Sequence, residues 1–554
     1  MSDQPASTVS DPYIQLPPWW QRHAGRVWAA AVGALTVLLT VISFPPVDMP
    51  EFAYAFAVPA IYWAYRRPSF RLYAGTLCAA QAVAWTALLW WLHHVTWAGL
   101  FLIGPFIGIW VGLWYLAVWW TMPRIIGRST PTRLLALLAL AGVWVLLEWL
   151  RTWFLSGFPW LPLAASQWQR TVLLQIAAFT GASGVSFVLV TVNLGFAAVA
   201  HSLFLEGQTG WRLRRPEFLL ALFLLMVCVS VHLQEMFNRA QFSRKLADVA
   251  FVQPYIPQEV KWNPARGPFI LDTLEKATLV AAVTEPDFIL WPEATTPWAV
   301  RGDARVRAWI ESLDVRAGRP LVLGSIATEN RGRPAEAWYN GVFVVAPDLG
   351  LQTIYYAKRH LVPFGEYVPL RPLLGWLSKV VPVGDDDFTR GISAAPLLVP
   401  LRHDSLAIGP LICFEDIFPA LARADVRNGA DFLFVATNNA WYGEGGMAYQ
   451  HAAHSVLRAV ETRRPVLRCS NGGWSGWIDE FGVIRGVLTD DRGSVYYRGV
   501  KTLPVKRDAR WVGRTSFYVE HGDWFVAVCA GLAGLGFLML MLCAITPTAT
   551  SHQF

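Results

Sequence analysis

The chain has 554 residues, of which 54% are apolar, only 15% are charged and 29 are tryptophan. So small a charged fraction excludes an ordinary soluble protein of this length and favours a membrane protein. The net charge of +7 comes largely from arginines in the loops between apolar stretches, where they indicate the membrane topology. Because the sequence has neither a basic tail nor aromatic residues interleaved with basic ones, we expect no nucleic-acid partner.

Apolar stretches that reach or approach the ~20 residues of a membrane-spanning helix recur along the chain. They cover residues 27–44, 52–65, 72–92, 99–120, 134–150, 178–205, 218–233 and 524–545. The second stretch is short and is interrupted by Pro59, so a tilted, half-inserted or buried helix is an alternative there. Residues 1–20 are polar and contain prolines, and no small-residue cleavage site follows the first apolar run, so we expect the first span to remain as an anchor.

These stretches divide the chain into four predicted parts. They are a cytoplasmic tail (residues 1–26), a membrane bundle of seven spans (27–235), an extramembrane domain (236–520) and a last span with a cytoplasmic C-terminus (521–554). Arginines cluster before span one and after spans two, four and six, whereas the opposite short loops carry only Arg151 and Arg170. By the positive-inside rule both termini lie in the cytoplasm, and the large domain lies on the periplasmic side of a bacterial inner membrane.

Two of the six cysteines, Cys413 and Cys469, lie in the extramembrane domain. The other four lie in apolar spans, where a free cysteine behaves as a small apolar residue. In an oxidising compartment, a disulfide between Cys413 and Cys469 is one expectation. The alternative is a reactive thiol, because Cys413 directly follows the apolar run "LAIGPLI" and precedes two carboxylates, Glu415 and Asp416.

The extramembrane domain has the pattern of an α/β domain. Short runs rich in β-branched and aromatic residues, such as "DVAFVQP" and "YNGVFVVAP", alternate with two intervals of helical spacing, residues 269–284 and 449–463. Glu293, Lys358 and Cys413 each follow a predicted strand, where functional groups collect in open α/β sheets. A base, a cation for an oxyanion and a thiol are the groups that nucleophilic catalysis requires.

The ordered motifs "WPEA", "YAKRHLVPFGEYVP" and "LICFED" resemble those of the nitrilase (carbon-nitrogen hydrolase) superfamily. Within it, "EWLRTWFLSGFPWLPLAASQW", "TGASGVSFVLVTVN", "IPQEVKW" and "RAVETRRPVLRCSNGG" make nearly the whole chain similar to the apolipoprotein N-acyltransferase family. The resemblance implies an α-helical polytopic membrane bundle of about eight spans and an α/β nitrilase-like αββα sandwich domain.

The resemblance also implies an enzyme that moves a fatty acyl chain from a phospholipid, such as phosphatidylethanolamine, through a cysteine thioester to the N-terminal amine of the diacylglyceryl-cysteine of lipoproteins. Glu293 would be the general base, Lys358 the oxyanion-stabilising cation and Cys413 the nucleophile. Supporting or pocket positions would be Glu366, Trp262, Phe414 and Glu415. We expect no cofactor and no metal, because no cluster has zinc spacing and interfacial or helix-face positions explain His93, His94, His451 and His454.

Departures from the family pattern keep other interpretations open: Phe414 replaces the commoner Tyr, and "VQPYI" and "TNNAWYG" are unusual. One alternative is a membrane-tethered amidase that hydrolyses a small amide, and another is a binding protein with a vestigial triad. Residues 370–383 fit either a core helix or an interfacial lid whose apolar stripe is Leu373, Leu374, Trp376, Leu377 and Val380. Near the end of span five, Glu148 and Arg151 either pair or place Arg151 near a phospholipid phosphate.

Overall fold

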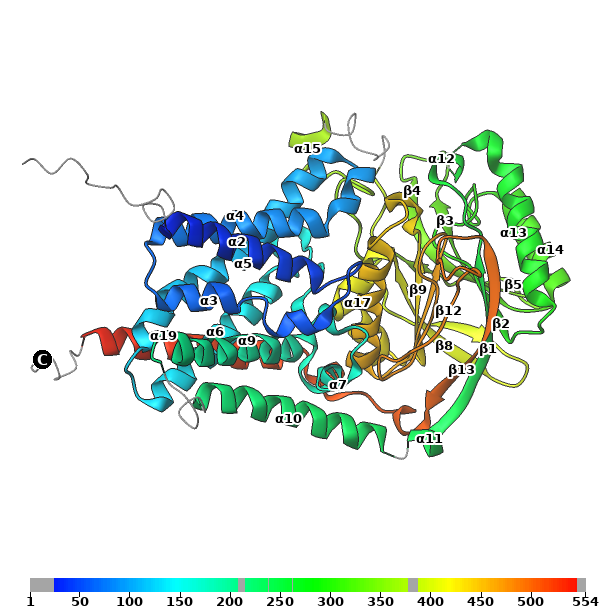
Figure 1. Cartoon of the computed structure of the whole chain (residues 1–554). Helices are drawn as coiled ribbons and strands as arrows, with labels where there is room; N and C mark the ends of the chain where they lie inside the picture. Colours follow the sequence, from blue (N-terminus) through cyan, green and yellow to red (C-terminus); the bar gives the residue numbers. More distant parts are fainter. Residues whose placement is uncertain (1–23, 208–214, 238, 262, 377–386, 546–554) are drawn as a thin grey trace, which may run out of the picture.

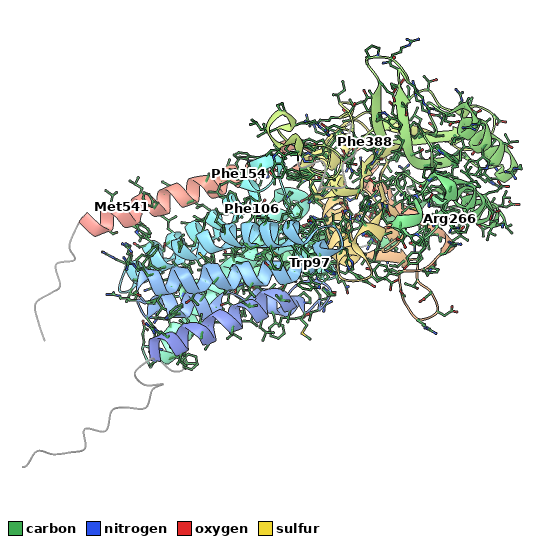
Figure 2. All side chains as sticks on the ribbon, turned by 90° about the horizontal axis from the view of Figure 1, so that it is seen from above. Trp97, Phe106, Phe154, Arg266, Phe388 and Met541 are labelled. Atoms are coloured by element: carbon green, nitrogen blue, oxygen red, sulfur yellow. The ribbon has the colours of Figure 1, made fainter. Side chains whose placement is uncertain are left out.

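The computed structural model describes residues 24–207, 215–237, 239–261, 263–376 and 387–545. A helical bundle lies beside an α/β domain, and the chain enters the domain after α10 (Pro216–Met236) and leaves it into α19 (Trp524–Ile545) (Figure 1). Trp97 lies near the domain, whereas Met541, close to the end of α19, lies at the far end of the bundle (Figure 2).

Each predicted apolar stretch contains a helix. The bundle comprises α2 (Ala24–Ile42), α3 (Val58–Tyr65), α4 (Phe70–Leu88), α5 (Trp97–Ile125), α6 (Thr130–Leu150), α9 (Ala182–Phe204), α10 and α19. Among the described residues, α2, α5, α6, α9, α10 and α19 are long and apolar enough to cross a membrane. The shorter α3 contains Pro59 and packs against α5 and α9, so the second stretch forms the buried helix that the sequence allows as an alternative.

The described turns after α3 and α5 and the start of α10 lie at the end of the bundle that faces away from the domain (Figure 1). Arg133, in the first turn of α6, donates to Glu217 at the start of α10 at 2.6 Å. Arg128 donates to the carbonyl of Cys543, near the end of α19, at 2.9 Å. The basic loops therefore share one end of the bundle, as the alternation of arginines along the chain predicts.

The last span, α19, packs along α6 at positions where small residues let the two backbones approach. A β-carbon added at Gly142 of α6 would lie 2.6 Å from the carbonyl oxygen of Cys529. Gly536 of α19 meets Ala139 of α6 in the same close manner. A larger side chain at Gly142 or Gly536 would therefore disturb the packing of these two helices.

The domain contains two mixed β-sheets. The first has the order β13-β1-β2-β3-β4-β5, with β6 also paired to β4, and the second has the order β12-β11-β10-β9-β8-β7. The first sheet comprises β1 (Ser243–Gln253), β2 (Phe288–Leu290), β3 (Leu321–Glu329), β4 (Ala337–Ala346), β5 (Gly350–Leu351), β6 (Tyr356–Ala357) and β13 (Gly499–Asp508). The second comprises β7 (Leu397–Pro400), β8 (Ser405–Ile412), β9 (Phe432–Thr437), β10 (Val466–Ser470), β11 (Gly476–Ile478) and β12 (Ile484–Val487).

The two sheets face each other across a buried apolar layer, and helices cover their outer faces. Phe288 of β2 and Phe432 of β9 stack in this layer with their ring centroids 5.9 Å apart. α13 (Gly267–Ala282) and α14 (Ala304–Ala317) cover the first sheet, and α16 (Pro419–Arg427) and α17 (Met447–Thr462) cover the second. The αββα sandwich is confirmed, and α13 and α17 lie where helical spacing predicts them.

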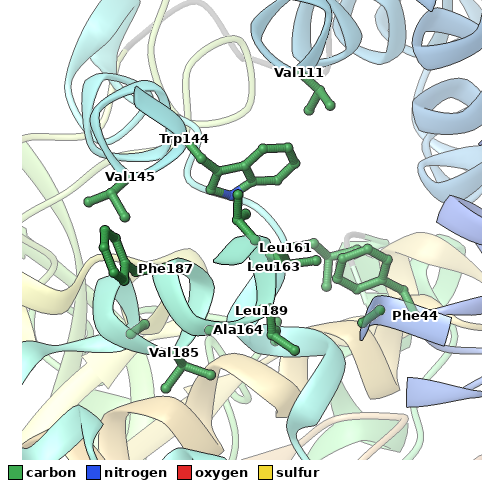
Figure 3. Close-up of a cluster of buried hydrophobic side chains, with 14 of the residues drawn as sticks. Phe44, Val111, Trp144, Val145, Leu161, Leu163, Ala164, Val185, Phe187 and Leu189 are labelled. Carbon is green, nitrogen blue, oxygen red and sulfur yellow. The ribbon is translucent and has the colours of Figure 1, made fainter. Parts of the chain in front are cut away.

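The bundle and the domain share one hydrophobic core rather than meeting through a polar interface. Side chains of α6, α9 and the loop between them, among them Trp144, Leu161 and Phe187, form part of this core (Figure 3). On the domain side it includes apolar residues of α17, a helix in which every residue except Tyr449 is buried. The second sheet is therefore fixed to the bundle through α17.

Gln450 of α17 joins the domain to the bundle through four buried hydrogen bonds. Its Oε1 accepts from the indole N–H groups of Trp91 at 3.0 Å and Trp160 at 2.9 Å. Its Nε2 donates to the carbonyls of Pro45 and Leu88, both at 2.9 Å. One side chain thereby holds three separate segments of the bundle against the domain.

We expect Gln450→Leu to lower the free energy of unfolding by about 2–3 kcal/mol, because it leaves two indole N–H groups and two carbonyls without partners. The measurement is the apparent midpoint of thermal unfolding of the full chain in detergent. Gln169→Leu is the matched control, since Gln169 is exposed and makes one hydrogen bond, to Asp48. Equal midpoints for the two variants would contradict a structural role for Gln450.

Candidate active site

Cys413 lies at a sharp turn directly after β8, at the start of a short 3₁₀ helix, η8 (Cys413–Ile417). Its φ is +51°, in the left-handed region that is unfavourable for a residue with a side chain. Strain of this kind costs about 1–3 kcal/mol and is retained where the surrounding structure enforces it, often at functional sites. Because β8 and β9 are parallel, Thr437 at the end of β9 lies at the same sheet edge.

Glu293 and Lys358 come from the facing sheet and meet a second carboxylate, Glu366. The ammonium of Lys358 lies 3.5 Å from Glu293 Oε1 and 2.8 Å from Glu366 Oε1. Only 1% of the Lys358 side chain is exposed, so both contacts are largely shielded from water. The structure therefore joins in one cluster the three carboxylate and ammonium groups that the sequence predicts.

Asn340 of β4 also belongs to this cluster, although the sequence analysis does not identify it. Its Nδ2 donates to Glu293 Oε1 at 2.9 Å and to Glu366 Oε1 at 3.1 Å. Its carbonyl accepts from the Lys358 N–H at 2.8 Å. Asn340 thus fixes both carboxylates and the backbone of Lys358; a polar residue inside the apolar run "YNGVFVVAP" is the sequence signal that points to it.

The electrostatics of the cluster keep the Cys413 thiol protonated at rest. Burial raises the pKa of the thiol to about 12, with Glu293 acting in the same direction and Lys358 and Thr437 opposing it. Burial would lower the pKa of Lys358, but Glu366 and Glu293 outweigh it and raise that pKa. A protonated thiol beside a carboxylate and an ammonium needs a base before it attacks.

A second ammonium, that of Lys261, lies behind Glu293 and was also missed. Lys261 ends the short helix α12 (Gln258–Lys261) and donates to the carbonyl of Glu293 at 3.0 Å. Burial lowers the pKa of Lys261 to about 8, while Glu293 and Cys413 oppose the shift. Trp262, which follows it and which the sequence predicts near the pocket, lies outside the described residues.

Glu415 is fully buried and holds the turn at Cys413 in place. Its carboxylate accepts hydrogen bonds from the backbone N–H groups of Ile412 at 2.7 Å, Arg359 at 2.6 Å and His360 at 3.0 Å, and from the Tyr356 hydroxyl at 2.7 Å. These bonds tie the end of β8 to the segment that carries Lys358. Glu415 therefore acts through the backbone rather than as a wall of the pocket.

Phe414 lies in an aromatic cluster that joins the turn at Cys413 to the bundle. Its ring centroid is 6.0 Å from that of Phe158, in the loop after α6, and 5.1 Å from that of Phe418. The ring of His360 lies 5.8 Å away. In these apolar contacts the side chain needs no hydroxyl, which explains how Phe is accommodated at this position.

Asp416 supports the turn from the other side through a buried polar network. Its carboxylate accepts from Arg468 at 2.7 Å, from Ser455 at 2.7 Å and from His451 Nε2 at 2.8 Å, and the same His451 nitrogen lies 3.1 Å from the Cys413 carbonyl. Burial opposes ionisation, but His451 and Arg468 hold the pKa of Asp416 below its usual range. His451 and His454 lie on α17, in agreement with a helix-face position, and both are fully buried where this helix packs between the second sheet and the bundle.

The other cysteine of the domain, Cys469, does not bond to Cys413, since both thiols are free. Cys469 belongs to β10 and points into the layer between the sheets, where its thiol donates to the Val252 carbonyl at 3.3 Å. The structure therefore contains no disulfide between Cys413 and Cys469. Within the described ranges, no group of three or more His, Cys, Asp or Glu side chains is arranged to hold a metal ion.

Two family models match the chain in separate parts. The one described as the apolipoprotein N-acyltransferase N-terminal domain matches residues 36–195, and the one described as carbon-nitrogen hydrolase matches residues 248–502. A protein named apolipoprotein N-acyltransferase from Geobacter metallireducens is 32% identical over 91% of this chain and 93% of its own length. The protein of the same name from Brucella melitensis is 30% identical over 93% of this chain and 98% of its own length. The one from Methylococcus capsulatus is 32% identical over 75% of this chain and 76% of its own length.

Proposed function

Because this chain belongs to the apolipoprotein N-acyltransferase family, it is a membrane acyltransferase of lipoprotein maturation, and we propose that it works through a thioester on Cys413. In this proposal Glu293 is the general base, Lys358 stabilises the oxyanion, and Glu366 and Asn340 hold these two groups. The acyl donor is a membrane phospholipid, phosphatidylethanolamine in our proposal, and the acceptor is the N-terminal amine of a diacylglyceryl-cysteine.

The observation that carries the proposal is the direct contact between the nucleophile turn and the bundle. Phe158 stacks on Phe414, and His360 Nε2 lies 3.0 Å from the carbonyl of Ser156 in the same bundle loop. A lipid ester at this end of the bundle would lie next to the Cys413 thiol. The alternative, a tethered hydrolase of a small soluble amide, has no need of a nucleophile packed on a membrane bundle.

The proposed reaction has two steps. Glu293 takes the proton of the Cys413 thiol, and the thiolate adds to the ester carbonyl, whose oxyanion the Lys358 ammonium stabilises. The ester C–O bond breaks, Glu293 returns the proton to the glycerol oxygen, and the lysophospholipid leaves. The amine of the acceptor then attacks the thioester carbonyl, and Glu293 accepts the amine proton. The C–S bond breaks, the amide product leaves, and Glu293 returns the proton to the Cys413 thiolate.

The orientation of the bundle belongs to the same proposal. The arginine-rich loops lie at the far end of the bundle, which the positive-inside rule assigns to the cytoplasm. The catalytic domain would then face the periplasm from the inner membrane, where lipoproteins carry their acceptor amines. Reaction of single introduced cysteines at the two ends of the bundle with a membrane-impermeant thiol reagent in intact cells tests this orientation.

The described part of residues 370–383 supports the lid rather than the core helix. Helix α15 covers only Arg371–Leu374, and Leu373 and Trp376 are 74% and 64% exposed. Leu377 and Val380 lie outside the described residues. We propose that these exposed apolar side chains meet the membrane surface.

Trp376→Asp should therefore reduce turnover of phospholipid in vesicles about tenfold and leave turnover of a small soluble ester unchanged, because it charges a side chain at the interface. Initial rates with the two substrates provide the measurement. Val283→Asp is the control, since Val283 is 81% exposed at the end of α13 on the outer face of the domain. Equal loss with both substrates would reject the lid.

The function itself is tested with purified full-length protein, phosphatidylethanolamine and a diacylglyceryl-cysteine peptide. We expect the peptide to gain the mass of one acyl chain, and the Cys413→Ala protein to give no gain. Release of free fatty acid or ammonia without acylated peptide would favour the tethered hydrolase.

A further inference from the structure

A cavity of about 300 Å³ lies where the bundle meets the catalytic domain. On the bundle side it is lined by the end of α6, the loop that follows, and the start of α9. On the domain side its wall includes Ile417 and Phe418, directly after the nucleophile turn. The mechanism above assigns no role to this space.

Arg151 lines the cavity and is a buried cation without an ion-pair partner. Its side chain lies 5.4 Å from the ring centroid of Trp85, and the residue is only 4% exposed. Among the described residues no carboxylate lies within ion-pair distance of it, and its Nη1 atom has no hydrogen-bond partner. A buried charge in this state is costly unless something compensates it.

The pairing of Glu148 with Arg151, one of the two expectations from the sequence, is not formed. Glu148 lies one turn earlier on α6, and its Oε1 accepts from the Trp144 indole at 2.8 Å and from the Leu163 N–H at 2.7 Å. Its charge offsets part of that of Arg151 without making an ion pair. The carboxylate is therefore engaged in holding the loop after α6.

The other charged groups of the cavity already have partners. Arg458 and Glu461 form an ion pair at 2.9 Å, and Glu461 also accepts from the Ala182 N–H at 2.8 Å. Asp523 accepts from the Trp149 indole at 3.0 Å. Of the described charged side chains that line the cavity, Arg151 is thus the one available to a ligand.

The start of α9 adds positive potential to the same wall. α9 has 23 residues and begins at Ala182, and both Ala182 and Ser183 line the cavity. The N-terminus of a long helix carries a partial positive charge and favours an anion. The helix end and the unpaired guanidinium are independent features, and both favour a negatively charged ligand.

We propose that this cavity binds the phosphodiester of the phospholipid donor, with Arg151 as its charge partner; the inference rests on the proposed function. η8 rises by ~2.0 Å per residue, so the cavity wall at Ile417 lies roughly 8 Å along the chain axis from Cys413. A lipid anchored there by its phosphate has its glycerol esters within reach of the thiol. Trp153, 53% exposed in the loop that lines the cavity, is an aromatic side chain of the kind found at headgroup level.

The test measures the rate of thioester formation on Cys413 without acceptor, by the mass of the intact full-length protein. Arg151→Gln is expected to raise the half-saturating concentration of phosphatidylethanolamine about 10- to 100-fold. With p-nitrophenyl palmitate, a donor that carries no phosphate, the same variant should react within about twofold of wild type. Arg151→Lys, which keeps the charge, should recover most of the loss.

Arg170→Gln is the matched control, because Arg170 is 49% exposed and already pairs with Glu51 at 2.9 Å; it should change neither rate. Equal losses with both donors in Arg151→Gln would overturn the proposal, as would an unchanged rate with the phospholipid. If wild-type protein forms no thioester with either donor, the proposed function fails. In that case, the affinity of the phospholipid for the Cys413→Ala protein is compared with its affinity for the double variant that also carries Arg151→Gln. Weaker binding to the double variant would support the cavity as the binding site independently of the reaction, and equal binding would contradict it.

Inorganic phosphate separates the two sources of the anion. Competition with phosphatidylethanolamine in wild type, abolished in Arg151→Gln, identifies a site that accepts any phosphate and upholds the anion site. If inorganic phosphate does not inhibit the wild-type reaction with phosphatidylethanolamine, the ligand is the lipid phosphodiester, and this result also supports the anion site. Inhibition of equal strength in wild type and variant would contradict Arg151 as the anion partner.

Discussion

Glu293→Gln should lower the rate of Cys413 acylation by about 10²–10⁴-fold. Burial holds the pKa of the thiol at about 12, so at neutral pH almost no thiolate forms without a neighbouring base. Glutamine keeps the size of the side chain and removes the base. The measurement is thioester formation with phosphatidylethanolamine, followed by the mass of the intact protein.

The pH dependence gives this prediction a second readout. Below the pKa of a thiol, the fraction of thiolate rises tenfold for each pH unit. The residual rate of Glu293→Gln should therefore rise about tenfold per unit between ~pH 7 and ~pH 9, whereas the wild-type rate should rise far less. The control is Glu259→Gln, which removes an exposed carboxylate on α12. A wild-type rate for Glu293→Gln would exclude Glu293 as the base.

Asp416→Asn should destabilise the protein by about 3–5 kcal/mol, the largest stability effect that we expect. Asp416 and Arg468 are both fully buried and lie 2.7 Å apart. Loss of the carboxylate leaves the guanidinium without its counterion in the core. The same change frees His451, which contacts the Cys413 carbonyl, so the acylation rate should also fall.

The apparent midpoint of thermal unfolding in detergent measures this effect, with an expected decrease of roughly 5 °C. The control is Asp272→Asn, which breaks the exposed pair of Asp272 with Lys276 at 2.8 Å on α13 and should cost less than about 1 kcal/mol. If Asp416→Asn unfolds with the wild-type midpoint, the buried pair makes no net contribution and the proposed support of the turn is incorrect.

The architecture was predictable because its pattern is local. Apolar runs mark the bundle helices, β-branched runs mark the strands, and the helical spacing of residues 269–284 and 449–463 corresponds to α13 and α17. Glu293, Lys358 and Cys413 were identifiable because each follows a strand, and sandwiched sheets bring strand ends together. The count of full spans was less certain, since Pro59 leaves α3 with eight residues.

The partners of these residues were not predictable from the sequence because they depend on pairing between distant elements. Asn340 reaches Glu293 through the register of β4, and Lys261 reaches the same residue from α12. The spacing of His451 predicts a helix-face position but not what covers that face. It is buried because the bundle covers α17, which no local pattern of the domain reveals.

The close fit of α19 against α6 has a consequence for biosynthesis. α19 follows the whole catalytic domain in the chain, whereas its partner α6 is one of the early helices. The surface of α6 around Gly142 is therefore synthesised long before α19 can cover it, and other molecules have to cover it in the meantime. A chain cut short before Trp524 would leave this surface without its partner helix.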